Sequence, residues 1–185
     1  ILGMKDCKFV IVLGGGGMAR KFINPLRKRG LSKNVQGRFG IEATRLNALF
    51  LMKFFGSVAN NKAPRSMAEV KHLLTRNKIV FCGCLIFVSK STSDGTAAKL
   101  ANYLGTNFLN LTDVDGLYTK DPSKYKDAKL VTKISYDDFE KIIDKINYKP
   151  GQHFVLDQLA TKIIKKHNVK TVILNGHKLN NFENY

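Results

Sequence analysis

Residues 111–122, LTDVDGLYTKDP, combine side chains that could hold a nucleoside. They follow a short apolar run that can end as a buried strand, and their Asp, Gly and Asp-Pro residues bend the chain. Thr112, Tyr118 and Asp121 supply a hydroxyl, a flat ring with a polar tip and a carboxylate. Because open α/β sheets bind ligands at the carboxyl ends of their strands, this composition predicts a nucleoside-binding loop. On the chemistry alone, an acidic surface turn is an equal alternative.

The glycines at positions 14–17 form a candidate phosphate-binding turn. They follow the apolar run KFVIVL at 8–13, which is typical of a strand covered on both faces, and helical spacing begins at Met18. Backbone N–H groups in such a turn, together with the start of the helix, can hold a phosphate. Glycine is required because a side chain would keep the phosphate away from the backbone. Arg20, one turn into the helix, can add a cationic fork.

Other segments must position these residues. A capping box at Ser66 and Glu69 predicts a helix to about Asn77, and a buried apolar strand follows over 78–88. The sequence then predicts a helix over 97–104, with Asp94 or a neighbouring serine as its N-cap and Gly105 as its C-cap. Further expected elements are a strand near Phe108, a helix from Ser135, a helix over 154–167 and a strand over 170–174.

Two of the helices have predicted inner and outer faces. Over residues 40–55, apolar side chains mark the stripe expected to pack inward, with Glu42 and Arg45 outside it. Over residues 154–167, three lysines are expected to face solvent. The inward residues of the first helix are Ile41, Leu46, Leu49, Leu51 and Met52, and the lysines of the second are Lys162, Lys165 and Lys166.

The segment LTDVDGLYTKDPSKYKDAKLVTKISYDDF resembles the nucleotide-binding segment of the amino-acid-kinase family, in its archaeal uridylate (UMP) kinase branch. VLGGGGMARKF, FGIEATRLNALFL and FVLDQLATKIIKKHNVKTVILNG are also similar, so the resemblance covers nearly the whole chain. It implies one α/β domain over residues 1–185, a three-layer αβα sandwich with a mainly parallel sheet. It also implies transfer of the ATP γ-phosphate to UMP, giving UDP, with Mg²⁺ bound through the nucleotide phosphates, and a homo-oligomer, hexameric in the family.

The resemblance also implies a role for individual residues. Asp94 would be catalytic, organising the charged groups around the transferring phosphate, and no protein metal ligand is expected. UMP would contact Gly15, Thr92, Ser93 and Asp94, and ATP would contact Gly16, Arg20, Thr112, Tyr118 and Asp121.

The sequence departs from the family pattern in three places. Gly37 stands where the family commonly has an Asp that holds the UMP ribose, and the stretch from Cys84 to Asp94 is longer and more apolar. The family's first glycine loop, its first strand and its closing strand have no counterpart, so we expect an incomplete domain. These departures leave open a non-catalytic nucleotide-binding remnant that keeps the ATP half of the site. A kinase of the same family acting on a carboxylate, a carbamate or isopentenyl phosphate is another alternative, which GIEATRLNALFL disfavours.

Charge and composition narrow the classes of partner. The formal net charge is +17, which favours polyanions, but the lysines are spread along the chain and no nucleic-acid-binding motif is present. A nucleotide substrate would also benefit from this positive charge. Cys7, Cys82 and Cys84 are an odd number without zinc spacing, so we expect reduced thiols. No apolar run reaches the roughly 18 residues of a membrane span, and we expect a cytoplasmic protein without a membrane partner.

Overall fold

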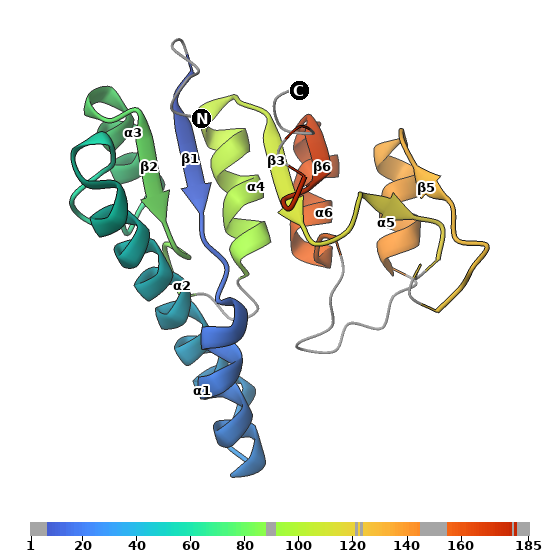
Figure 1. Ribbon diagram of the computed structural model, residues 1–185, viewed down its shortest axis with the longest axis horizontal. Helices are drawn as coiled ribbons and strands as arrows, with labels where there is room; N and C mark the ends of the chain where they lie inside the picture. Colours follow the sequence, from blue (N-terminus) through green and yellow to red (C-terminus); the bar gives the residue numbers. More distant parts are fainter. Residues whose placement is uncertain are drawn as a thin grey trace. The chain divides into compact units, whose positions relative to one another are not determined.

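The computed structural model describes residues 7–87, 92–120, 122, 124–144, 155–178 and 180. The chain forms two compact units, Ile1–Leu100 and Ala101–Tyr185, and helix α4 (Ser93–Leu104) begins in the first and ends in the second. Each unit contains a pair of parallel strands (Figure 1). The organisation as one domain over residues 1–185 stays a prediction. No helix in the described ranges is long and apolar enough to cross a membrane.

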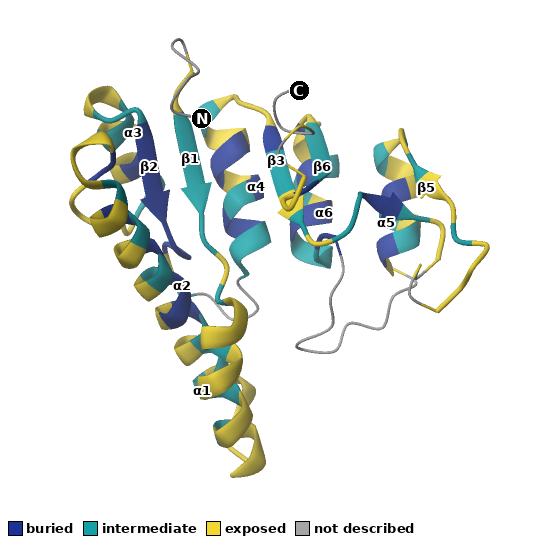
Figure 2. Ribbon diagram, in the orientation of Figure 1, coloured by how far each residue is buried: buried dark blue, intermediate teal, exposed yellow. Residues whose placement is uncertain are grey.

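In the first unit, β1 (Phe9–Val12) pairs in parallel with β2 (Ile79–Cys82). All of β2 is buried (Figure 2), because α2 (Lys33–Phe55) packs against it and α3 (Met67–Arg76) packs against both strands. Ile79 and Phe81 form the core there with Ala48 and Met52 of α2. The strand is shorter than the one predicted over 78–88, because the chain leaves the sheet at Gly83.

The buried face of α2 differs from the predicted stripe. Ile41 and Met52 are buried as expected, but Leu46 and Leu49 keep 48% and 43% of their surface exposed. The remaining buried positions carry small residues, Ala43, Thr44 and Ala48. Small side chains let the helix backbone approach the chain at the end of β2, whereas leucines there would hold it away. α1 (Gly16–Lys28) lies along α2 and has no buried residue (Figures 1 and 2).

The connection between α2 and β2 is held by hydrogen bonds to β2 itself. It includes the short helix η1 (Gly56–Val58) and then Asn60, which is fully buried. Phe81 N donates to Asn60 Oδ1 at 2.7 Å, and Asn60 Nδ2 donates to Phe81 O at 3.0 Å. α3 begins as predicted, since Glu69 N donates to Ser66 Oγ at 3.1 Å. Glu69 closes the cap by accepting from Arg65 N.

In the second unit, β3 (Phe108–Thr112) pairs in parallel with β6 (Thr171–Asn175). Along the chain, these two strands are separated first by the antiparallel hairpin of β4 (Leu117–Tyr118) and β5 (Leu130–Val131). The helices α5 (Tyr136–Asp144) and α6 (Gln158–His167) come next and pack against each other. α6 begins later than predicted, because the Asp157 carboxylate caps it by accepting from Ala160 N at 2.8 Å.

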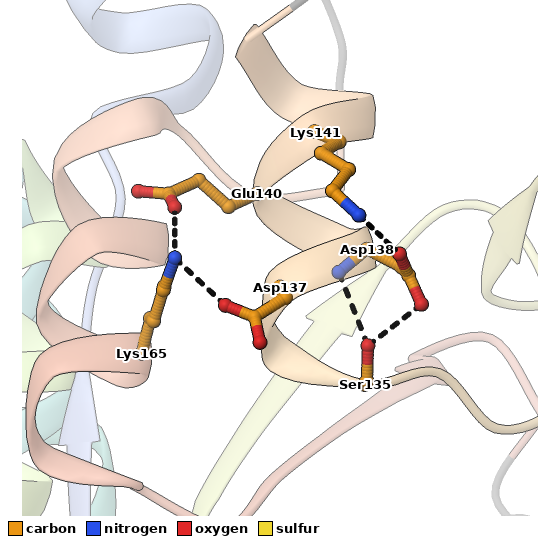
Figure 3. A network of polar contacts seen from close by, with 6 residues as sticks. All are labelled: Ser135, Asp137, Asp138, Glu140, Lys141 and Lys165. Carbon is orange, nitrogen blue, oxygen red and sulfur yellow. Dashed lines mark hydrogen bonds and ion pairs between the residues drawn. The ribbon is translucent and has the colours of Figure 1, made fainter.

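Ion pairs join α5 to α6 (Figure 3). Lys165 Nζ lies 2.8 Å from Asp137 Oδ1 and 2.6 Å from Glu140 Oε2. Lys165 was predicted to face solvent, but it faces α5. Asp138 stays within α5, where it binds Ser135 and Lys141. The hydrogen bond from Lys165, and then its charge, lower the pKa of Asp137.

We expect Lys165→Met to weaken the acid sensitivity of folding. A carboxyl group with a lowered pKa in the folded state stabilises the fold above its unfolded pKa, and the effect is lost as the pH falls through the folded value. Urea midpoints at pH 7 and pH 3 should therefore differ less in the variant than in the wild type. Lys162→Met, on the exposed side of the same helix, is the control and should keep the wild-type difference. Equal acid sensitivity in all three proteins would contradict the prediction.

Candidate active site

The glycine turn follows β1 and is fixed against α2. Gly15 is the N-cap of α1, and Gly16 has a φ of +50°, which favours glycine. A Cβ on Gly15 would lie 2.5 Å from Ala19 Cβ and 3.3 Å from the carbonyl oxygen of Gly40 in α2. Asn47 of α2 also donates a hydrogen bond to Gly14 O at 2.8 Å. The turn therefore favours glycine at position 16 for its backbone conformation and at position 15 because a Cβ there would collide with Ala19.

The loop after β2 is held by the same helix. A Cβ on Gly83 would lie 2.6 Å from Arg45 N and from Thr44 C, so β2 ends in direct contact with the backbone of α2. Cys84 N donates to Thr44 Oγ1 at 2.9 Å. The Arg45 guanidinium donates to the carbonyl oxygens of Cys84 and Leu85 at 3.0 and 2.8 Å. Arg45 was expected outside the packing face, but it anchors this loop.

The start of α4 positions the predicted catalytic carboxylate. The N-cap is Thr92, whose Oγ1 accepts a hydrogen bond from Gly95 N at 3.0 Å, so the prediction of Asp94 or a serine as the cap is wrong. The geometry favours Thr92 because a cap binds the backbone N–H three positions later, which is Gly95. Asp94 instead lies in the first turn of α4, where the helix dipole favours a negative charge.

The glycine turn and the start of α4 meet within the first unit. A Cβ on Gly14 would lie 3.7 Å from Ser93 Oγ, which is ordinary van der Waals contact. The buried Cys84 thiol lies beside the start of α4. Burial raises its pKa, hydrogen bonds with Thr96 and Thr44 oppose this, and the charge of Asp94 raises it further. The carboxyl ends of the parallel strands β1 and β2 thus lead to a site that combines a glycine turn, hydroxyl groups and a carboxylate.

Two of the departures from the family pattern lie against each other. A Cβ on Gly37 would lie 3.5 Å from Phe87 Cε2, so the ring of Phe87 stands directly in front of this glycine. The guanidinium carbon of Arg38 lies 5.1 Å from the centre of the same ring, within range of a cation–π interaction. The loop after β2 therefore places an aromatic ring against the first turns of α2, beside the exposed cation of Arg38.

The predicted ATP residues lie in the second unit. Thr112 ends β3 opposite Asn175 of β6, and Tyr118 lies in β4. Thr112 thus stands at the carboxyl end of a parallel strand and Tyr118 in the segment that follows it, which is where a ligand-binding loop is expected. Asp121 lies outside the described residues. Gly16 and Arg20, the other two predicted ATP residues, begin α1 in the first unit, and Arg20 is exposed.

In the sequence, Asp115 looks like a turn residue only. In the structure its carboxylate accepts a hydrogen bond from Asn175 Nδ2 at 2.8 Å and pairs with Lys178 Nζ at 2.7 Å. The partners are 60 and 63 positions away along the chain, so no local spacing could have indicated them. Among the described residues, no group of three His, Cys, Asp or Glu side chains lies close enough together to hold a metal ion.

The parallel strand pairs, with polar loops at their carboxyl ends, define an α/β protein, a class in which ligands bind at these ends of the strands. Residues 2–175 match the model of the amino acid kinase family, and the chain belongs to that family.

Its relatives include proteins named uridylate kinase. The protein of Hyperthermus butylicus is 36% identical over 170 residues, which are 91% of this chain and 74% of the relative. The protein of Methanobrevibacter smithii is 35% identical over 92% of this chain and 76% of its own length. Among solved structures, uridylate kinase from Archaeoglobus fulgidus superposes with a TM-score of 0.81 at 32% identity, over 93% of this chain and 77% of that one.

A more distant structure shows the fold alone. Aspartate kinase from Synechocystis superposes with a TM-score of 0.71 at 18% identity, covering 92% of this chain and 32% of its own. Together with the parallel strand pairs, these likenesses confirm the predicted α/β fold of the amino-acid-kinase type.

Proposed function

We propose that this protein is a nucleoside monophosphate kinase that transfers the γ-phosphate of ATP to a phosphate oxygen of UMP, giving ADP and UDP. The observation that carries the proposal is the close approach of the glycine turn to the start of α4 at the carboxyl ends of β1 and β2, where a Cβ on Gly14 would lie 3.7 Å from Ser93 Oγ. Relatives named uridylate kinase, at 35–36% identity over nine-tenths of the chain, support the choice of UMP. They also favour an enzyme over a non-catalytic remnant.

On the acceptor side, the backbone N–H groups of the turn and the start of α1 would hold the phosphate of UMP. Gly15 is proposed for this contact, since a Cβ there would lie 2.5 Å from Ala19 Cβ and leave no room for another residue. Thr92 and Ser93 would hold UMP from the start of α4. Asp94 would keep the cationic groups near the transferring phosphate in place. Phosphoryl transfer needs positioning and charge neutralisation more than a protein nucleophile, and this set of residues supplies both.

On the donor side, Gly16 and Arg20 would approach the phosphates of ATP. Thr112, Tyr118 and Asp121 would seat its nucleoside. Mg²⁺ prefers oxygen ligands and usually keeps several waters. The described residues include no cluster that could hold it alone, so it would bind through the nucleotide phosphates, with Asp94 as a carboxylate of the site. When bound there, Mg²⁺ neutralises charge on the transferring phosphate.

A cytoplasmic homo-oligomer is part of the proposal. α2 carries exposed aromatic side chains in its last turns, with Phe50 and Phe54 66% and 75% exposed. Their rings stack with centroids 6.3 Å apart, which gives one apolar surface on the outside of the helix. Large exposed apolar residues in a group favour a protein–protein contact. A second copy of the chain would cover them.

The decisive test follows ADP release by the purified chain with ATP, Mg²⁺ and UMP. We expect ADP to form only when UMP is present and in equal amount to UDP, with AMP a poorer acceptor. Calorimetric titrations with ATP·Mg²⁺ and with UMP complete the test. Binding of ATP without binding of UMP or turnover would support the remnant, and binding of neither nucleotide would overturn the proposal.

A further inference from the structure

The loop between β3 and β4 crosses the end of β6. Gly116 in this loop has a φ of +150°, and a Cβ there would lie 3.2 Å from Leu130 Cδ1 and 3.9 Å from the carbonyl oxygen of Ile173. A side chain at this position would strain the backbone and press on β5. The loop therefore lies close over β6, and Tyr118 follows two residues later.

Three side chains fasten this loop, and we call them the Asp115 clasp: Asp115, Asn175 and Lys178. Asn175 Nδ2 donates to Asp115 Oδ1 at 2.8 Å, and Lys178 Nζ donates to Asp115 Oδ2 at 2.8 Å. One carboxylate oxygen thus accepts from the last residue of β6 and the other from Lys178, three residues after the strand ends. Hydrogen bonds from Lys178 and Asn175 lower the pKa of Asp115, because both stabilise the ionised carboxylate.

The Asp115 clasp is joined to β3 at Thr112, because Asn175 of the clasp is the strand partner of Thr112. Asn175 is only 9% exposed and pairs in register with Thr112. Its own Oδ1 accepts a hydrogen bond from His177 N at 2.9 Å, and Gly176 N donates to Thr112 O at 2.8 Å. The side chain of Asn175 is therefore fixed from both ends. Asp115 links this fixed point to the loop between Thr112 and Tyr118.

We propose that Asp115 is a positioning residue for the ATP half of the site, which it serves by tying the β3–β4 loop to Asn175 and Lys178. The inference rests on the proposed function, because it gives the clasp the task of holding Thr112 and Tyr118 in the geometry that binds a nucleoside triphosphate. Ion pairs as exposed as Asp115–Lys178 contribute little to folding stability. The effect of the clasp is therefore expected in nucleotide binding and not in stability.

The test measures the two substrates separately in the full chain. Asp115→Ala should raise the KM and the Kd for ATP about tenfold, the usual effect of losing hydrogen bonds to a charged group, and leave the KM for UMP within about twofold. Lys178→Met should have a smaller effect in the same direction. The double variant should be no worse than Asp115→Ala, because both changes break the same contact.

Asp137→Asn is the matched control. It removes a carboxylate that also pairs with a lysine in the second unit, but on α5, and neither KM should change. An unchanged KM for ATP in folded Asp115→Ala, or an equal rise for both substrates, would overturn the inference. Failure of the proposed function is distinguishable. If the wild-type chain binds ATP but does not convert UMP, the proposed function is wrong. The ratio of the ATP Kd of Asp115→Ala to that of the wild type then still decides the role of Asp115.

Discussion

Gly83→Ala is expected to lower the free energy of unfolding by about 3 kcal/mol, the upper end of the usual cost of overpacking. The new Cβ would lie 2.6 Å from Arg45 N, Thr44 C and Thr44 Oγ1. Two of these are backbone atoms inside α2, which cannot move aside as the end of a flexible side chain can. Either the helix or the end of β2 must shift, and the hydrogen bonds of Thr44 and Arg45 to the following loop are then lost. Urea unfolding followed by circular dichroism measures the change.

Gly37→Ala is the matched control for this prediction. Its Cβ would meet only Phe87 Cε2 at 3.5 Å, an ordinary contact, and the position lies inside α2. Alanine is preferred over glycine in a helix by about 1 kcal/mol, so this variant should be as stable as the wild type or more stable. Equal unfolding midpoints for the two variants would show that the contact between β2 and α2 is not as tight as the structure has it.

Asp94→Asn is expected to lower kcat on the order of 100-fold or more, as removal of one preorganised electrostatic group does in other active sites. The side chain keeps its size and loses its charge. The helix start should survive, because Thr92 and not Asp94 is the N-cap of α4. A lower kcat with an unchanged unfolding midpoint would therefore show that Asp94 acts in phosphoryl transfer and not in folding.

The measurement is initial rates at saturating ATP and UMP, together with the KM for each substrate. Asp144→Asn, a carboxylate in the last turn of α5, serves as the control and should keep full activity. If Asp94→Asn retains more than about a tenth of the wild-type kcat, the carboxylate is not the group that organises charge at the transferring phosphate.

The parts of the fold that follow from neighbouring residues could be predicted from the sequence. The cap at Ser66 is confirmed because its hydrogen bond joins positions only three residues apart. The end of α4 at Gly105 is confirmed as well, with a φ of +63° that suits glycine. The turn after β1 follows from its glycines. In each case a single local rule decides the conformation, and no distant contact competes with it.

Features set by distant contacts could not be predicted. The leucine pattern of α2 suggested a buried stripe through Leu46 and Leu49, but the end of β2 approaches the small residues of the helix instead. Arg45 looks like a solvent-facing residue in the sequence, and only the structure shows the carbonyl groups that it binds. The Asp115 clasp is of the same kind. Its members become neighbours only when β3 and β6 pair.

The positions of Gly40, Thr44 and Asn47 on α2 have a consequence for motion. One helix of 23 residues holds the glycine turn through Gly40 and Asn47 and the loop after β2 through Thr44. Regions that share one rigid support open as a cooperative unit, with a common free energy of local unfolding. The backbone amides of both loops should therefore exchange their hydrogens together, at the rate at which α2 itself separates from β2.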